Sequence, residues 1–219
     1  MVLQGQKLPK ESIDGITKNM EKSCLGGNET YLSPKDEILE IISADEVDKE
    51  RLFQLIPELR VADEYYPSSK AHNLSVLDHS LQALKMDIVQ SDTERLALLL
   101  HDIAKPETDL LPKDRKDFHP EIGAEMALPI LDRILTDEEE IKDIHNIIAL
   151  HDIWYEDIDD NLATDIAKLL PPDKLQMLFN VQTADLFAHE KGFVDLKLKK
   201  LLAVQNLIKE KSNNLYPPQ

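Results

Sequence analysis

The sequence predicts an all-α protein, and three observations lead to that expectation. The 219 residues include only six glycines and 5% aromatic residues, a composition that favours helices over turn-rich strands. Long stretches consist of Leu, Ile, Ala, Lys and Glu, most of which are good helix formers. Apolar residues also recur at helical spacing behind residues that can cap a helix. With 42% hydrophobic residues, the chain can bury a sizeable core.

The first part of the chain predicts a polar lead-in followed by two short helices. Residues 1–32 carry mixed charges with little periodicity, so we expect them to be loosely ordered or separately packed. Ser33 can cap a helix that has Pro34 at its first position. A second helix should open at Ser43–Glu46, which has the spacing of a capping box.

The middle of the chain predicts one amphipathic and one buried helix. Residues 74 to about 89 place their leucines on one stripe, which indicates the amphipathic helix. Ser91–Glu94 forms another capping box, and it opens the strongly apolar run Leu96–Ile103. We expect Lys105-Pro106 to stop this buried helix and residues 106–118 to form a charged loop.

The last part of the chain predicts four more helices. His119 restarts the chain with Pro120 at the first helical position. Thr136–Glu139 caps the next helix. Two further helices are expected at about 173–188 and 194–211.

Charge and cysteine content narrow the possible functions. A formal net charge of −17 repels phosphate backbones, which argues against nucleic acid as the main partner. Small phosphorylated substrates remain possible because bound divalent cations invert the local field. The single cysteine, Cys24, excludes an internal disulfide and a multi-thiolate metal site. Any metal must therefore be bound by histidines and carboxylates.

The lengths of the apolar segments argue against attachment to a membrane. The amino terminus lacks the apolar core of a signal peptide, and no segment approaches the roughly 18 apolar residues of a membrane span. We therefore expect a cytoplasmic protein.

The most informative string is LALLLHDIAKPETD, in which His101 and Asp102 end a hydrophobic helix. Burying an imidazole and a carboxylate is costly unless something pairs with them, and a cation is an efficient partner. Lys105 follows His101 by four residues and should lie on the same helical face. The pattern places a ligand pair and a positive charge together, as phosphate chemistry requires.

Further histidines and aspartates fall on apolar faces. They are His79, His119, His151 and Asp185. Each alone is more often a hydrogen-bonded core histidine or a capping aspartate, so the prediction of a metal site depends on their number. Other polar residues have simpler interpretations. His72 fits a cap or surface position, His145 an exposed position, and His189 a helix end or a contact behind Asp185. Asp152 is either exposed or orients His151, and Glu121 and Glu125 fit a solvated face.

The order of these residues resembles a known family. His79, then His101-Asp102, then a distant Asp185 is similar to the H…HD…D signature of the HD superfamily of phosphohydrolases. Closer still, Leu55 to about Leu202 resembles the HD domain of some bacterial tRNA nucleotidyltransferases, through the strings VLDHSLQAL, LALLLHDIAKP, FHPEIGAEMA and ALHD. Their nucleotidyltransferase domain has no counterpart in this sequence, so tRNA processing is not implied.

The resemblance implies a fold, a site and a division of the chain. It implies an HD-domain helical bundle over residues 51–211, preceded by a polar lead-in with short helices at 1–50 and followed by a tail at 212–219. By resemblance, the primary metal site consists of His79, His101, Asp102 and Asp185, with Asp102 placed to bridge. His119 and His151 match positions that bind a second metal in binuclear members. Nitrogen and oxygen ligands suit Mn, Fe, Co, Ni, Zn or Mg, and the sequence does not choose among these metals or between one and two ions.

Two departures from the family pattern concern the pocket. Ala104 stands where the family usually has glycine, a small-for-small change that should leave the ligands intact. Phe118 also stands where a glycine usually precedes the histidine, and this change can narrow or reshape the pocket.

The function that these residues favour is metal-dependent hydrolysis of a phosphate ester. Cations would activate a water molecule and stabilise charge on the phosphoryl oxygens, with Asp102 and Lys105 as catalytic residues. The resemblance implies a small nucleotide as substrate, cut by phosphodiesterase or phosphomonoesterase activity. The alternative from a different class is a non-catalytic HD protein that senses a nucleotide or docks a partner. A helical bundle with unrelated histidines is a third alternative. The sequence leaves the oligomeric state open.

Overall fold

A computed structural model describes residues 32–67, 74–111 and 118–217. Every regular element in these ranges is a helix, and they contain no strand, which confirms the all-α prediction. Residues from Ser33 onward form one compact unit. Residues 1–31 of the predicted polar lead-in, which include Cys24, lie outside the described residues. None of the described helices is both long and apolar enough to cross a membrane.

The described chain begins with three short helices, α2 to α4. Helix α2 (Pro34–Ile42) starts as predicted, because the Ser33 side chain accepts a hydrogen bond from the Asp36 amide. The predicted start of the second helix is wrong: α3 (Lys49–Leu55) is capped by Asp48. Ser43 is the C-cap of α2, so it ends one helix and does not open the next. Helix α4 (Leu59–Glu64) was not predicted from the sequence.

Helices α5 to α7 differ from the prediction mainly at their ends. Helix α5 spans Val76–Ala83 and is shorter than expected. The capping box at Ser91 is confirmed, and it opens α6 (Asp92–Leu100). Lys105-Pro106 does not stop this helix, which has already ended at Leu100. Instead it opens the one-turn helix α7 (Lys105–Thr108), where the missing amide of a proline costs nothing. Part of the predicted loop, 112–117, lies outside the described residues.

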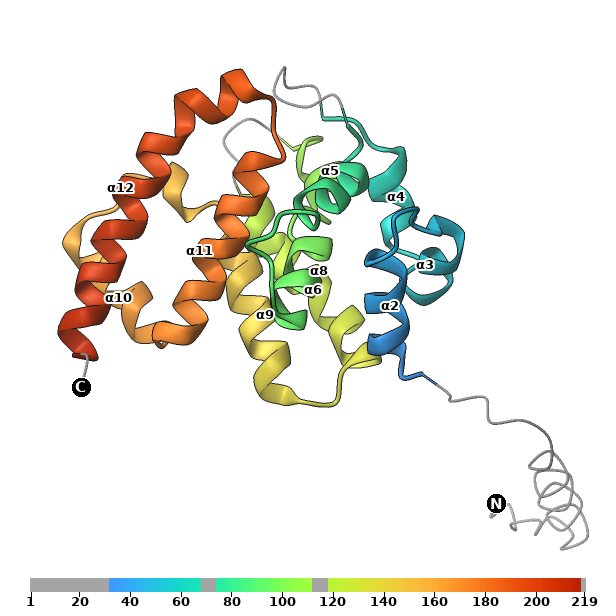
Figure 1. The fold of residues 1–219 in the computed structure, drawn as a ribbon, viewed down its shortest axis with the longest axis horizontal. Helices are drawn as coiled ribbons and strands as arrows, with labels where there is room; N and C mark the ends of the chain where they lie inside the picture. Colours follow the sequence, from blue (N-terminus) through green and yellow to red (C-terminus); the bar gives the residue numbers. More distant parts are fainter. Residues whose placement is uncertain (1–31, 68–73, 112–117, 218–219) are drawn as a thin grey trace, which may run out of the picture. The chain divides into compact units, whose positions relative to one another are not determined.

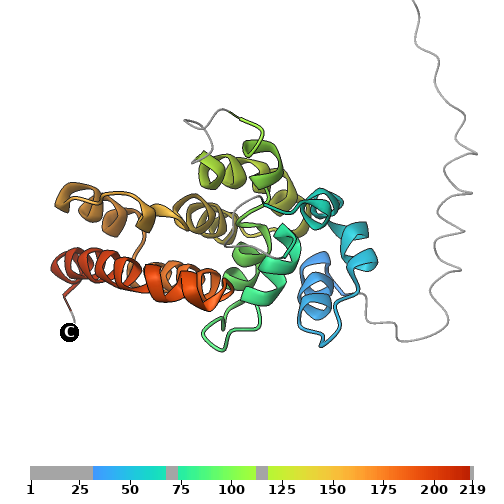
Figure 2. The same ribbon diagram turned by 90° about the horizontal axis from the view of Figure 1, so that it is seen from above.

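The remaining helices complete the bundle. Helix α8 (His119–Ile134) has Pro120 in its first turn, as predicted. Helix α9 (Glu138–Leu150) is capped by Asp137 instead of Thr136. The sequence did not predict the 3₁₀ helix η2 (Ile153–Tyr155) or α10 (Asp160–Leu169). Helix α11 (Pro172–Phe187) matches its prediction, and α12 (Lys191–Leu215) is longer than expected. Figures 1 and 2 show α12 running beside α10 and α11.

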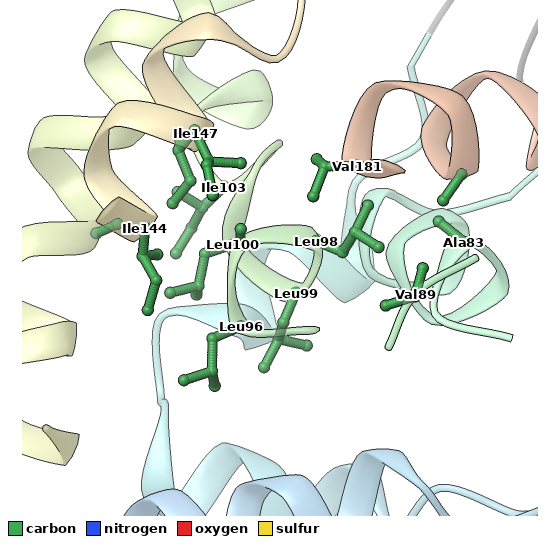
Figure 3. Close-up of a cluster of buried hydrophobic side chains, with 14 of the residues drawn as sticks. Ala83, Val89, Leu96, Leu98, Leu99, Leu100, Ile103, Ile144, Ile147 and Val181 are labelled. Atoms are coloured by element: carbon green, nitrogen blue, oxygen red, sulfur yellow. The ribbon is translucent and has the colours of Figure 1, made fainter. Parts of the chain in front are cut away.

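Helix α6 forms the middle of the core and packs against α5, α9 and α11. Leu96, Leu98 and Leu100 are completely buried, and Figure 3 shows them between Ile144 of α9 and Val181 of α11. Each fully buried side chain of this size contributes about 1.5–3 kcal/mol. The packing therefore fixes the ends of α6 and α9, after which His101 and His151 follow.

Candidate metal centre

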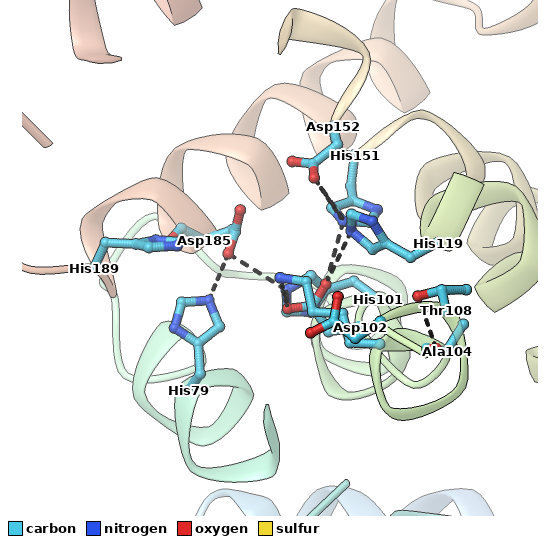
Figure 4. A network of polar contacts seen from close by, with 12 residues as sticks. His79, His101, Asp102, Ala104, Thr108, His119, His151, Asp152, Asp185 and His189 are labelled. Carbon is cyan, nitrogen blue, oxygen red and sulfur yellow. Dashed lines mark hydrogen bonds and ion pairs between the residues drawn. The ribbon is translucent and has the colours of Figure 1, made fainter. Parts of the chain in front are cut away.

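The structure brings together all six side chains that the sequence proposed as ligands (Figure 4). They come from elements far apart in the sequence. His79 lies on α5, His101 and Asp102 follow α6, His119 begins α8, His151 follows α9, and Asp185 lies on α11. Five are nearly inaccessible, with exposed fractions between 0% for His101 and 4% for Asp185. The His119 side chain is 12% exposed.

His101 and His151 are held in the same way. Each is the C-cap of a buried helix, and its Nδ1 lies 2.7 Å from the carbonyl oxygen three residues earlier, Leu98 O for His101 and Ile148 O for His151. A carbonyl can only accept, so Nδ1 carries the proton that donates this hydrogen bond. In the neutral ring the Nε2 lone pair is then available for a metal. The ends of two core helices thus aim two nitrogen ligands at one place.

Asp102 lies between the histidines. Its Oδ2 is 3.2 Å from His101 Nε2, and its Oδ1 is 3.4 Å from His119 Nε2 and 3.5 Å from His151 Nε2. None of these contacts has hydrogen-bonding geometry. Asp102 Oδ1 and the three Nε2 atoms are buried without a hydrogen-bond partner. Each buried polar atom left unsatisfied costs about 1–3 kcal/mol, so this convergence fits a bound cation.

Asp185 extends the cluster towards α5. Its Oδ1 lies 2.6 Å from His79 Nε2 and 3.4 Å from His101 Nε2. His189, one turn further along the chain, donates from Nδ1 to the Asp185 carbonyl oxygen at 2.9 Å, and its ring centroid lies 4.5 Å from that of His79.

Three overlapping groups of side chains could hold a metal ion, each with its ligand atoms within 4.8 Å of one another. They are His79–His101–Asp102, His79–Asp185–His189 and Asp102–His119–His151. Asp102 belongs to two of them, so its carboxylate is placed to touch ions at two positions. The donor set, imidazole and carboxylate without thiolate, suits several divalent metals and does not select one.

Neighbouring charges keep the buried acids and bases of the cluster ionised, although burial alone favours their neutral forms. Burial alone would raise the pKa of the Asp102 carboxyl, but His101 and Lys105 outweigh it and hold that pKa well below its usual range. Burial likewise opposes protonation of His101, yet Asp102 and Asp185 raise its pKa to about 10. Despite burial, Asp102 and Asp152 raise the pKa of His119 to about 9. In the metal-free protein, protons on these imidazoles take the role of a cation.

Lys105 contacts the cluster, but not for the predicted reason. Its Nζ donates to Asp102 Oδ2 at 2.6 Å, and its side chain is 17% exposed. The sequence placed it on one helical face with His101, whereas residues 101–104 form turns between α6 and α7. Burial would lower the pKa of Lys105, but Asp102, Asp152 and Asp185 raise it. The lysine therefore stays positively charged at neutral pH.

Two side chains, those of Asp152 and His189, lie closer to the cluster than the sequence suggested. Asp152 Oδ2 lies 3.2 Å from His119 Nε2 and 3.8 Å from His151 Nε2, so it faces the cluster with its side chain 20% exposed. His189 lies against His79, as described above. A signal for Asp152 was present, because the string His-Asp-Ile occurs at 101–103 and again at 151–153.

The residues with simpler interpretations lie elsewhere. His145 is half-buried and lies 3.4 Å from Glu125 Oε1, so the expected exposure is only partial. Glu121 and Glu125 are exposed, as predicted. His72 lies outside the described residues.

Comparison with known proteins does not identify the chain. No known protein-family model matches it, and no curated protein matches it. A functional assignment must therefore be argued from the site itself.

Proposed function

We propose that this protein is a metal-dependent phosphohydrolase of the HD type. The observation that carries the proposal is the convergence of four buried, unpartnered ligand atoms, on His101, Asp102, His119 and His151. Two further side chains adjoin these atoms. Asp185 Oδ1 lies 3.4 Å from His101 Nε2, and His79 Nε2 lies 2.6 Å from the same Asp185 oxygen. A structural network would satisfy its buried polar atoms internally, whereas a ligand set leaves lone pairs for an ion.

The candidate ligands would bind metal ions at two positions. His79, His101, Asp102 and Asp185 would hold one ion, and Asp102, His119 and His151 would hold a second. A divalent cation supplies a water nucleophile near neutral pH and stabilises negative charge on phosphoryl oxygens. Asp102 belongs to both groups and would be a ligand at both positions.

Lys105 would hold the substrate phosphate. In the metal-free protein its ammonium group pairs with Asp102 Oδ2. With a cation held at the centre, that ammonium group would be available to a phosphoryl oxygen. Because its pKa is raised, Lys105 would act as a fixed positive charge and would not transfer a proton.

The proposal uses no side-chain nucleophile. Thr108 is the hydroxyl residue shown beside the cluster in Figure 4, and its Oγ1 donates to the Ala104 carbonyl oxygen at 3.1 Å. It is 1% exposed and therefore out of reach of a substrate. The resemblance of the sequence to HD phosphohydrolases supports a small nucleotide as the substrate, cut at a phosphodiester or phosphomonoester bond.

Metal analysis followed by a hydrolysis screen tests the proposal. The purified protein should contain stoichiometric divalent metal and hydrolyse a generic phosphodiester or a nucleotide. Asp102→Ala should abolish hydrolysis, and Glu121→Gln, which alters an exposed carboxylate on α8, should leave it unchanged. The double variant His119→Ala/His151→Ala should reduce metal content from two ions to one.

The outcomes separate the alternatives. Absence of bound metal, or hydrolysis that survives Asp102→Ala in a folded protein, contradicts the proposal. Stoichiometric metal without turnover of any phosphate ester favours the nucleotide-sensing alternative. Circular dichroism of each variant distinguishes loss of chemistry from loss of fold.

A further inference from the structure

The half-buried lysines of the described residues fall into two groups. Five of them have a carboxylate oxygen within 4 Å: Lys35, Lys49, Lys105, Lys174 and Lys211. The other two, Lys197 and Lys200 on α12, have no carboxylate partner in the described ranges. Partly burying an ammonium group without a counter-ion is unfavourable, and a protein of net charge −17 has many carboxylates to offer. This pair of lysines therefore calls for another anion.

Both lysines flank Tyr155. Lys197 Nζ lies 5.0 Å from the centroid of the Tyr155 ring and 5.8 Å from that of Phe193. Lys200 Nζ donates to the Tyr155 carbonyl oxygen. Aromatic faces and carbonyl oxygens hold an ammonium group in place without cancelling its charge. The contacts thus orient two positive charges and leave both uncompensated.

These charges lie beside the candidate metal centre. The Phe193 ring stacks on His189 at a centroid distance of 4.8 Å, and His189 in turn lies 4.5 Å from His79. Figure 4 shows His189 at the edge of the cluster, next to Asp185. On the other side, η2 connects Tyr155 directly to His151 and Asp152. Burial, and then the carboxylates of the centre, raise the pKa of the Tyr155 hydroxyl, as expected for a group within their field.

We propose that Lys197 and Lys200 bind a second anionic group of the substrate. The substrate class is then a phosphate ester that carries another phosphate besides the one at the metal centre, such as a nucleoside diphosphate. This inference rests on the proposed function, because the metal centre is what receives the first phosphate. An ammonium–phosphate contact is a charge-assisted hydrogen bond, and its loss should weaken binding about tenfold.

Equilibrium binding of two matched probes tests the inference without requiring turnover. Adenosine 5′-monophosphate and adenosine 5′-diphosphate differ by one phosphate, and each is titrated into the Mn²⁺-supplemented protein by calorimetry. Lys197→Gln removes one charge, and Lys197→Arg keeps it. Lys199→Gln is the matched control, because Lys199 is exposed on the same helix two residues away. Lys197→Gln/Lys200→Gln extends the series.

The intrinsic fluorescence of the protein gives a second readout. Trp154 is the single tryptophan, it is completely buried, and its ring centroid lies 3.8 Å from that of Tyr155. A ligand that draws Lys197 away from the Tyr155 ring should change the Trp154 emission.

The inference predicts that Lys197→Gln weakens diphosphate binding about tenfold and leaves monophosphate binding within about twofold. Lys197→Arg and Lys199→Gln should bind both probes like the wild type. Equal losses in Lys197→Gln and Lys199→Gln, equal losses for the two probes, or no measurable binding of either probe overturns the inference. If Lys197→Gln selectively weakens diphosphate binding but the wild-type protein hydrolyses no phosphate ester, the anion site is supported and the proposed catalysis is refuted.

Discussion

Gly123 is a point of close approach between α8 and the turn that carries His101 and Asp102. A Cβ at this position would lie 3.3 Å from the His101 carbonyl oxygen and 3.7 Å from both Ala104 Cβ and Ile148 Cγ2. The first distance is shorter than ordinary van der Waals contact. The His101 backbone follows the buried end of α6, so it has little room to retreat.

Gly123→Ala therefore sets two effects against each other. Alanine favours the helical conformation by about 1 kcal/mol relative to glycine. Overpacking against a fixed backbone costs about 1–3 kcal/mol. We expect the crowding to prevail and the free energy of unfolding to fall by about 1 kcal/mol. The displaced helix also carries His119 one turn earlier, so metal affinity should fall about tenfold or more.

Urea unfolding of the chelated protein and metal titration of the folded protein measure the two effects. Gly192→Ala is the matched control, because a Cβ there has no neighbour within 4 Å in the first turn of α12. It should stabilise the protein by up to about 1 kcal/mol and leave metal affinity unchanged. If Gly123→Ala stabilises the protein like Gly192→Ala and binds metal normally, the reasoning about the α8 contact is refuted.

Three further predictions concern charge and metal at the centre. Asp102→Asn should lower the stability of the metal-free protein by about 3 kcal/mol, because it leaves the half-buried Lys105 ammonium group without the carboxylate that it contacts. A loss below about 1 kcal/mol in urea would contradict the pairing. The melting temperature of the chelated protein should fall between pH 7 and 10. Protonation of His101 and His119 stabilises the fold fully below their ordinary pKa of 6.5. This stabilisation is lost as the pH rises through the folded pKa of His119, about 9, and that of His101, about 10. In His119→Gln the melting temperature should fall less over this pH range than in the wild type, and an equal fall would argue against this assignment. Chelation should remove about 2.7 kcal/mol at a metal concentration 100 times Kd, and calorimetry that detects no change would exclude a tightly bound ion.

The sequence was sufficient to predict which histidines and aspartates come together, but not the loops around them. His101 and His151 stand out because each follows an apolar run, and an imidazole in such a place needs a partner. The fold class follows from the same runs and from caps such as Ser33 and Ser91, whose predicted hydrogen bonds are present. These features are local, so the sequence carries them directly.

Elsewhere the outcome depends on packing that the sequence does not show. Ser43 has the chemistry of an N-cap, yet the preceding helix uses it as a C-cap, and Asp48 takes the predicted role. Lys105 reaches Asp102 through a turn that helical periodicity does not describe. Asp152 was interpreted as exposed or as orienting His151, because no periodicity indicated η2, the short helix that follows it. Such choices between competing local structures are settled by tertiary contacts.

The paired ends of α6 and α9 have a consequence for the geometry of the candidate metal centre. Each His-Asp pair follows a buried helix, so the gap between the two pairs is set by how closely those helices pack. Ile144 and Ile147 of α9, which Figure 3 shows facing Leu100 and Ile103, act as spacers for that gap. Trimming or enlarging one of them changes the spacing without touching a ligand. The spacing of the candidate metal centre therefore depends partly on the hydrophobic core, and a substitution in the core can alter the centre although it changes none of its polar side chains.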